Sequence, residues 1–405
     1  MKLKKIIRYL LKTLFVLFVI LFAYFVYLAI WTYQFNADQE KIIENIDADF
    51  YQTSQIIRDP NGYLGTVATI NGQHTDTLLF DTQASTSLAR QETLDRYEAE
   101  YWRRKPMPTF NFYKQVYFSK LYRVNNINIG NCELKGIVFT SVPKDNGMYN
   151  ALYRPVLGRS VMENMVWKFD MDKNEMGMFP FKNREKLKQE TAGFTSVEGG
   201  VNKFQLYSEQ TDTLSLMLDL GSNYDILIDK DVYETLRQHH ASRKYVNYRR
   251  KGLTDTIAEF SGITMQCNGV VVPDCVLDYM PSINKNIAGN IFAGKVNFIL
   301  AGENLYLKQR TDTLSAVNGF PALGLNIYVR EGNVCVTALE INGLAEKSGL
   351  RLGDKVISVD NGAVGADIMS VSSGKLEKYI QQADSLTLEI ERDGKRQVFN
   401  IARED

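Results

Sequence analysis

The sequence predicts a mainly β protein made of two repeated lobes, with one transmembrane helix before them and a separate domain after them. Three observations lead to this prediction. An uncharged apolar segment lies near the N-terminus, a strand that ends in aspartate occurs twice in the same context, and the character of the chain changes after about residue 315. An internal repeat has to be recognised before a fold is assigned, because it decides how the chain divides.

The N-terminal segment has the length of a membrane-spanning helix. Residues 13–35 are 23 residues without a formal charge, rich in Leu, Phe, Val and Ile, which is enough to cross a bilayer. The basic residues before it are Lys2, Lys4, Lys5, Arg8 and Lys12. The positive-inside bias therefore predicts a cytoplasmic stub at residues 1–12 and an extracytoplasmic location for the bulk of the chain.

A cleaved signal peptide is the alternative for this segment. Its apolar core would be shorter and would end in a small-x-small site, whereas the segment here ends in Ile-Trp-Thr-Tyr-Gln-Phe, whose aromatic residues suit a membrane interface. We therefore expect an uncleaved, single-pass signal anchor, facing a periplasm if the source is a Gram-negative bacterium. Residues 36–54 are expected to form a linker, and the segment from residue 40 to residue 55 reads as a helical stalk or linker.

A strand-like apolar run ends in an aspartate and a turn at two places. The first is Leu-Leu-Phe-Asp-Thr-Gln-Ala-Ser around Asp81, and the second is Leu-Met-Leu-Asp-Leu-Gly-Ser around Asp219. One such aspartate is usually a turn former. Here, however, each is followed by two apolar residues and a glycine, Gly158 and Gly289, at offsets of 77 and 70 residues. Two such aspartates indicate one shared pair.

Other segments repeat in the same order. Short helices are expected at residues 90–98 and 230–238, and strand-like segments close the copies at residues 165–170 and 296–300. The chain from about residue 55 to residue 310 therefore reads as two homologous lobes.

These motifs resemble those of aspartic proteases of the pepsin and retropepsin kind. In that family two apolar residues precede Asp-Thr-Gly or Asp-Ser-Gly, and a later apolar-apolar-Gly segment crosses beneath this motif. Residues 157–160, Leu-Gly-Arg-Ser, are close to the retropepsin form of the second element. The lobes are shorter than those of pepsin and look more like a fused pair of retropepsin-type units. The resemblance covers roughly 250 of the 405 residues.

The resemblance implies an aspartic endopeptidase that hydrolyses polypeptides through Asp81 and Asp219, with no metal and no cofactor. Two adjacent carboxyl groups cannot both ionise cheaply, so one keeps a proton. The charged group can then activate a water while its neutral partner donates to the developing oxyanion. Activity on the acid side of neutral is expected. The supporting loop residues would be Thr82, Ala84, Ser85, Gly221, Ser222, Gly158 and Gly289.

Both motifs depart from the family pattern. Gln83 stands where the first motif carries glycine, and Leu220 replaces the Thr or Ser of the second, so a hydroxyl-to-backbone brace between the lobes would survive only at Thr82. Three residues after each aspartate, Ala84 offers no hydroxyl and Ser222 offers one. A hydrogen bond from Ser222 would favour a charged Asp219 as the base, with Asp81 as the proton carrier. An inactive lobe pair that binds peptide without cutting it is the alternative function.

Other catalytic classes have few candidate residues. The chain has three histidines and no glycine-rich phosphate loop between a strand and a helix, which argues against Ser/His, Cys/His, histidine–metal and nucleotide chemistry. Equal numbers of acidic and basic residues, 47 each, argue against nucleic-acid binding.

Three further segments lead to open expectations. Cys267 and Cys275 flank a probable turn and could bridge in an oxidising compartment, although buried free thiols are favoured. The basic run of residues 237–251 is expected to be a solvated loop. Residues 110–122 are the candidate for the hairpin flap that closes over substrate in the resembling family.

After about residue 315 the pattern Ala-x-x-x-Gly-Leu-x-x-Gly-Asp at residues 345–354 resembles a PDZ domain of the kind common in bacterial envelope proteases, over about 85 residues. This resemblance implies an α+β domain that binds a peptide C-terminus by strand addition, with Leu323, Gly324 and Leu325 as the carboxylate loop. Residues 375–382 would form the other groove wall. A domain that merely packs on the lobes is the alternative.

The expected architecture places aspartyl protease lobe 1 at residues 55–190, lobe 2 at residues 191–312 and the PDZ domain at residues 316–403. The expected partners are a polypeptide substrate, a C-terminal peptide ligand at the PDZ domain and the membrane.

Overall fold

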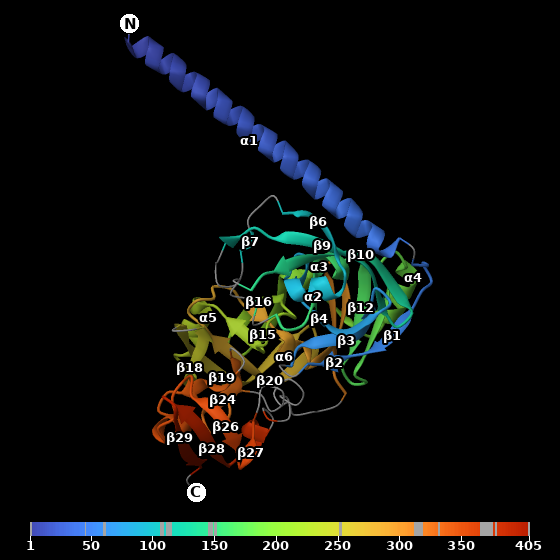
Figure 1. Ribbon diagram of the computed structural model, residues 1–405. Coiled ribbons are helices and arrows are strands. Elements are labelled where there is room, and N and C mark those ends of the chain that lie inside the picture. The colour runs from blue at the N-terminus through green and yellow to red at the C-terminus, as the bar shows by residue number, and fades with distance from the viewer. Residues whose placement is uncertain are drawn as a thin grey trace.

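The structure is a computed structural model and is mainly β, as predicted (Figure 1). It describes residues 2–403 apart from residues 45, 60–61, 106–108, 111–115, 145–148, 150–151, 251–252, 312–318, 331–332, 365–375 and 377–378. The helices are α1 (Lys2–Glu40), α2 (Gln91–Arg96), α3 (Arg159–Met162), α4 (Arg184–Glu190), α5 (Lys230–Leu236), α6 (Asn290–Ala293) and α7 (Leu344–Lys347), with short 3₁₀ turns η1 (Lys41–Ile43) and η2 (Gly200–Asn202).

The N-terminal helix α1 is long and apolar enough to cross a membrane, and it projects from the β body in Figure 1. The uncharged residues 13–35 form its middle, and their side chains are largely exposed. Its last turns pack on the body, where the Trp31 and Phe35 rings stack at 5.3 Å and Phe35 meets Trp102 at 5.9 Å. Asp38 pairs with Arg123 at 2.9 Å.

Residues 57–157 form the first unit, an eight-stranded sheet in the order β2-β3-β4-β11-β5-β10-β9-β6. Its strands are β2 (Ile57–Arg58), β3 (Leu64–Ile70), β4 (His74–Phe80), β5 (Ser87–Arg90), β6 (Glu100–Arg104), β9 (Lys120–Ile129), β10 (Cys132–Val142) and β11 (Val156–Leu157). Alternating burial along β9 matches a sheet with one face on a core. The expected helix at residues 90–98 is α2.

Residues 204–288 form the second unit, in which the strand order of the first is repeated. The strands are β15 (Phe204–Ser208), β16 (Asp212–Leu218), β17 (Ile226–Ile228), β18 (Arg243–Arg250), β19 (Leu253–Cys267), β20 (Val270–Tyr279) and β21 (Ile287–Ala288). Their order β15-β16-β21-β17-β20-β19-β18 corresponds to β3-β4-β11-β5-β10-β9-β6. The repeat read from the sequence therefore has a counterpart in strand order.

A six-stranded sheet in the order β1-β13-β12-β22-β23-β14 joins the two units. Its strands are β1 (Gln52–Gln55), β12 (Met165–Asp170), β13 (Glu175–Pro180), β14 (Thr195–Val197), β22 (Val296–Ala301) and β23 (Asn304–Gln309). The two strands that close the repeats, β12 and β22, pair antiparallel, and Phe169 stacks on Phe298 at 4.4 Å. Residues 52–55 lie in this sheet and are not part of a helical stalk, because β13, more than 100 residues later, supplies their pairing partner.

The C-terminal unit continues the sheet of the second unit. Its strands are β24 (Leu325–Arg330), β25 (Asn333–Glu340), β26 (Lys355–Val359), β27 (Gly362–Ala363), β28 (Ser385–Arg392) and β29 (Lys395–Ala402). Strand β25 pairs antiparallel with β18 through Tyr245↔Glu340, Val246↔Leu339 and Asn247↔Ala338. Most of the basic run, expected as a solvated loop, is therefore a strand with partners on both edges. A local pattern could not predict this, because one partner comes from a distant unit.

The structure also describes part of the candidate flap and the four cysteines. Strands β7 (Thr109–Phe110) and β8 (Val116–Tyr117) pair antiparallel as a hairpin, within the candidate flap; residues 111–115 of that candidate lie outside the described residues. All four cysteines are free, including Cys267 and Cys275.

Candidate active site

The two aspartates occupy equivalent places in the two units. Asp81 follows β4 and Asp219 follows β16. The amide of Asp81 donates to the carbonyl of Leu157 at 3.0 Å, and the amide of Asp219 donates to that of Ala288 at 2.9 Å. Each aspartate is thus held by the short strand that precedes its glycine motif.

The two glycines lie directly under the aspartate loops. A Cβ on Gly158 would lie 2.5 Å from the carbonyl of Thr86, and one on Gly289 would lie 2.2 Å from the carbonyl of Tyr224. Such distances are shorter than any normal contact, so each position requires glycine. The next residue in each unit donates its amide at 2.7 Å to the loop, Arg159 to Ala84 and Asn290 to Ser222.

The side chains of Asp81 and Asp219 meet between the units and share a hydrogen bond. Asp81 Oδ1 also accepts from the amides of Gln83 and Ala84, both at 2.8 Å. Asp219 Oδ1 accepts from the amide of Gly221 at 2.9 Å. Gly221 has to be glycine because a Cβ there would lie 2.4 Å from Asp81 Oδ2.

Burial is the largest cause that raises the pKa of both carboxyl groups. For Asp81, the two amide bonds and the bond with Asp219 oppose this rise. For Asp219, the charge of Asp81 adds to burial, and the pKa rises to about 7. Since amide donors stabilise a carboxylate and Asp81 accepts two of them against one at Asp219, the charge is favoured on Asp81 and the proton on Asp219 when the pair holds a single proton.

This assignment reverses the expectation drawn from Ser222. The Ser222 amide donates to the backbone carbonyl of Asp219 at 3.0 Å, while the carboxylate of Asp219 accepts from Gly221 instead of the Ser222 hydroxyl. The two carboxylates differ in the backbone amides that they accept from, which a comparison of the residue types Ala84 and Ser222 does not reveal. Ser85 lies exposed on the loop after Asp81.

The brace between the units is present at Thr82, as expected. Buried Thr82 donates from Oγ1 to the carbonyl of Leu218 at 2.7 Å and accepts from the amide of Leu220 at 3.2 Å. The side chain of Leu220 is fully buried in the core. Gln83 also reaches across, because its Nε2 donates to Leu218 O at 2.8 Å.

Two residues near the pair have no signal in the motifs. The half-buried Tyr63 lies close to Asp59, Tyr224 and both aspartates, and burial followed by these charges raises the pKa of its phenol. Asn290 is fully buried, and its Oδ1 accepts from the amide of Leu64 at 3.1 Å while its Nδ2 donates to Gly62 O. Only the position of Asn290 after the second glycine could have drawn attention to it.

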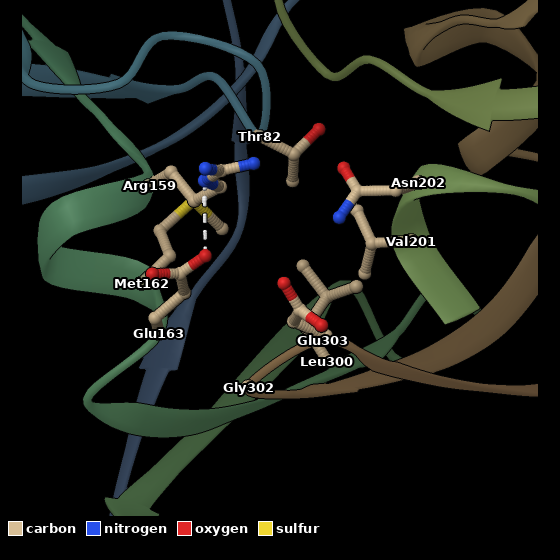
Figure 2. A pocket seen from close by; sticks show the side chains of 9 residues that line it. All are labelled: Thr82, Arg159, Met162, Glu163, Val201, Asn202, Leu300, Gly302 and Glu303. Carbon is tan, nitrogen blue, oxygen red and sulfur yellow. Dashed lines mark ion pairs between the residues drawn. The ribbon is translucent and has the colours of Figure 1, made fainter. Parts of the chain in front are cut away.

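On the other side of the unit interface, no corresponding contact is made among the residues that the structure describes. Arg159, the counterpart of Asn290, pairs with Glu163 of its own helix at 2.9 Å. A small hollow remains there between α3 and the segments around η2 and Gly302, and Thr82 lies at its rim (Figure 2). Neither aspartate lines this hollow, so it is distinct from the carboxyl pair.

The predicted carboxylate loop of the C-terminal unit lies against the second unit. Leu323 and Leu325 are fully buried, and Gly324 between them has a φ of +78°. Strand β24 pairs with β25, and no other described strand pairs with its second edge. Residues 376 and 379–382, in the segment expected as the other groove wall, are helical.

Arg243 of β18 holds this loop. Its guanidinium donates to both carboxylate oxygens of Glu340 and to the carbonyls of Phe320 and Pro321. The Phe320 ring stacks on Tyr245 at 4.2 Å, and the Phe320 amide donates to buried Glu259 at 2.7 Å. The loop is therefore fixed relative to β18.

Among the described residues, no group of three or more His, Cys, Asp or Glu side chains is arranged to hold a metal ion. No protein-family model and no curated protein matches this chain.

Proposed function

We propose that this protein is an aspartic endopeptidase anchored in a membrane by α1. The observation that carries the proposal is the meeting of Asp81 and Asp219, each delivered by the same strand of a repeated unit and each held by the same backbone bond. This arrangement is what the resemblance to pepsin and retropepsin implies.

The proposed reaction uses the unequal environments of the pair. Asp81, charged and bonded to two amides, accepts a proton from a water as that water attacks the peptide carbonyl. Asp219, which carries the proton, donates to the developing oxyanion and so stabilises the tetrahedral intermediate. As the C–N bond breaks, Asp81 passes the proton that it took from water to the leaving amine, and Asp219 takes a proton back from a hydroxyl of the intermediate. The pair then returns to its starting state with the peptide bond hydrolysed.

A peptide-binding scaffold without catalysis is the second candidate. Gln83 and Leu220, which depart from the resembling motifs at positions next to the aspartates, favour it. Both candidates share the architecture, so only the chemistry separates them.

We further propose that the C-terminal unit is a PDZ-type domain that recruits a substrate or regulates the cleft. Support comes from the open edge of β24, to which a peptide could add as a strand, and from the sheet that continues through β25 into β18. A peptide bound at β24 would thus lie two strands away from the second unit. The proposed anchor places this whole assembly outside the cytoplasm.

The deciding experiment uses the full chain in lipid nanodiscs with a denatured protein mixture as substrate, scanned from acid to alkaline pH. Asp81→Asn and Asp219→Asn are compared with Asp231→Asn, an exposed aspartate on α5. Acid-favoured cleavage that is lost in the first two variants and kept in the third supports hydrolysis. Absence of cleavage at every pH, with peptide binding intact, supports the scaffold.

A further inference from the structure

The contact between the two aspartate loops is one-sided. Thr82 of the first unit donates to Leu218 O of the second and accepts from the Leu220 amide. Leu220 occupies the equivalent place in the second unit, and its side chain has no group that could donate back. A symmetric pair would have a side-chain donor from each unit, so one of the two is missing.

Gln83 supplies another donor at the same place. Its Nε2 lies 2.8 Å from Leu218 O, the oxygen that also accepts from Thr82 at 2.7 Å. A carbonyl oxygen has two lone pairs and can accept both bonds. Because the acceptor is a carbonyl, the amide nitrogen of Gln83 has to face it.

The position of Gln83 joins the environments of both aspartates. Its backbone amide donates to Asp81 Oδ1, while its side chain holds the carbonyl of Leu218, the residue immediately before Asp219. Leu218 and Asp219 are linked by one rigid peptide plane. A donor on Leu218 O therefore restricts how far Asp219 can move from Asp81.

We propose that Gln83 is a positioning residue that adds a second bond from the first unit to Leu218 O and so holds the two aspartates at a fixed separation. The inference rests on the proposed aspartate-pair chemistry, which it deepens. It explains a departure that would otherwise count against catalysis, because the long side chain of Gln83 is engaged with the opposite unit.

The test measures the titration of the pair, which does not depend on cleavage. Gln83→Met in the full chain in nanodiscs keeps the length of the side chain and removes its N–H. Isotope-labelled aspartate carboxyls followed by NMR give the midpoint at which Asp219 loses its proton. Gln73→Met, an exposed glutamine in the turn after β3, is the matched control, and Gln83→Ala is the second variant if methionine does not pack.

We expect the titration midpoint of Asp219 to move down by about 0.5 to 1 pH unit in the Gln83 variants. The hydrogen bond from Gln83 contributes about 1 kcal/mol to holding the two carboxyl groups close together, and without it the charge of Asp81 raises the pKa of Asp219 less. The same shift is expected in the alkaline limb of any cleavage profile. Gln73→Met should leave both unchanged. An unchanged midpoint in both Gln83 variants overturns the inference. A shifted midpoint in a chain that never cleaves supports it while rejecting hydrolysis.

Discussion

Burial raises the pKa of both members of the aspartate pair, and backbone amides make the two members unequal. Asp81 accepts two of them and Asp219 accepts one, so two identical side chains differ in basicity. Burial makes a second charge between the units unfavourable, and the pair keeps a single proton as a result. The neighbouring residue types, Ala84 and Ser222, had predicted the opposite difference.

The rate of cleavage should therefore decrease at alkaline pH. Asp219 must be protonated to donate, and its pKa is about 7, so the rate should decrease about tenfold per pH unit above that value. A pH–rate profile under substrate-limited conditions checks this. A rate that stays constant well into the alkaline range would contradict the assignment of the proton to Asp219.

The same carboxyl group should make stability depend on pH. The pKa of Asp219 is about 7 in the folded chain and about 3.9 in an unfolded one. Between these values the folded chain binds the extra proton, so the free energy of unfolding falls as the pH rises. Asp219→Asn should consequently raise the melting temperature at mildly alkaline pH and leave it nearly unchanged at acid pH. Thermal unfolding in detergent checks this, with Asp231→Asn as the control. Equal shifts of the melting temperature at acid and at mildly alkaline pH would contradict the prediction.

Between secondary-structure elements, the pairing of β18 with β25 is the contact that joins two units. Tyr245 and Phe320 pack there beside Glu259, and Arg243 binds Glu340 and two carbonyls. The strand edge that the second unit would otherwise expose is covered in this way, which removes a template for aggregation.

Removal of the Arg243 charge should loosen this pairing. Hydrogen bonds to charged groups contribute about 1.5–3 kcal/mol, so Arg243→Met should speed amide exchange in β18 and β25 by about 10- to 100-fold. Hydrogen exchange of the full chain measures it. Arg237→Met, which removes an exposed intrahelical pair with Glu234, should leave exchange in these strands unaltered. Equal effects of the two substitutions would mean that Arg243 does not hold the junction.

Taken across all its units, the molecule has a membrane-length helix at one end and the C-terminal unit at the other, with β4 and β16, the strands before the two aspartates, between them. The proposed peptide site at β24 depends on Gly324. A side chain there would meet Glu340 at 3.2 Å, on a backbone with a φ of +78°.

Gly324→Val should abolish binding of a peptide with a free C-terminal carboxylate, because a side chain at this φ would displace the loop from Glu340 and Gly343. Fluorescence anisotropy with the free and the amidated peptide tests this on the full chain. Gly394→Val is the control, since Gly394 has a similar φ of +72° with open space around it. Equal binding of the two peptides to the unsubstituted chain would argue against a carboxylate site.

Local sequence patterns were sufficient for the features that depend on neighbouring residues. Hydrophobic length predicted a helix over residues 13–35, and the recurrence of the motif around Asp81 and Asp219 predicted a repeat whose strand order the two sheets share. These features can be read from a single sequence because strand alternation, helix length and turn chemistry depend on residues that are close together in the chain.

Tertiary structure decided the features that depend on distant partners. Which aspartate holds the proton follows from amides at Gln83, Ala84 and Gly221, and the direction of the Gln83 side chain follows from a carbonyl 135 residues away. The basic run around Arg243 pairs on one edge with β19, the next strand, and gained its second edge partner from β25, where Glu340 lies 97 residues later. No local pattern records such contacts, since each forms only when two separately folded segments meet, and hydrogen bonding across that interface sets the chemistry of the pair.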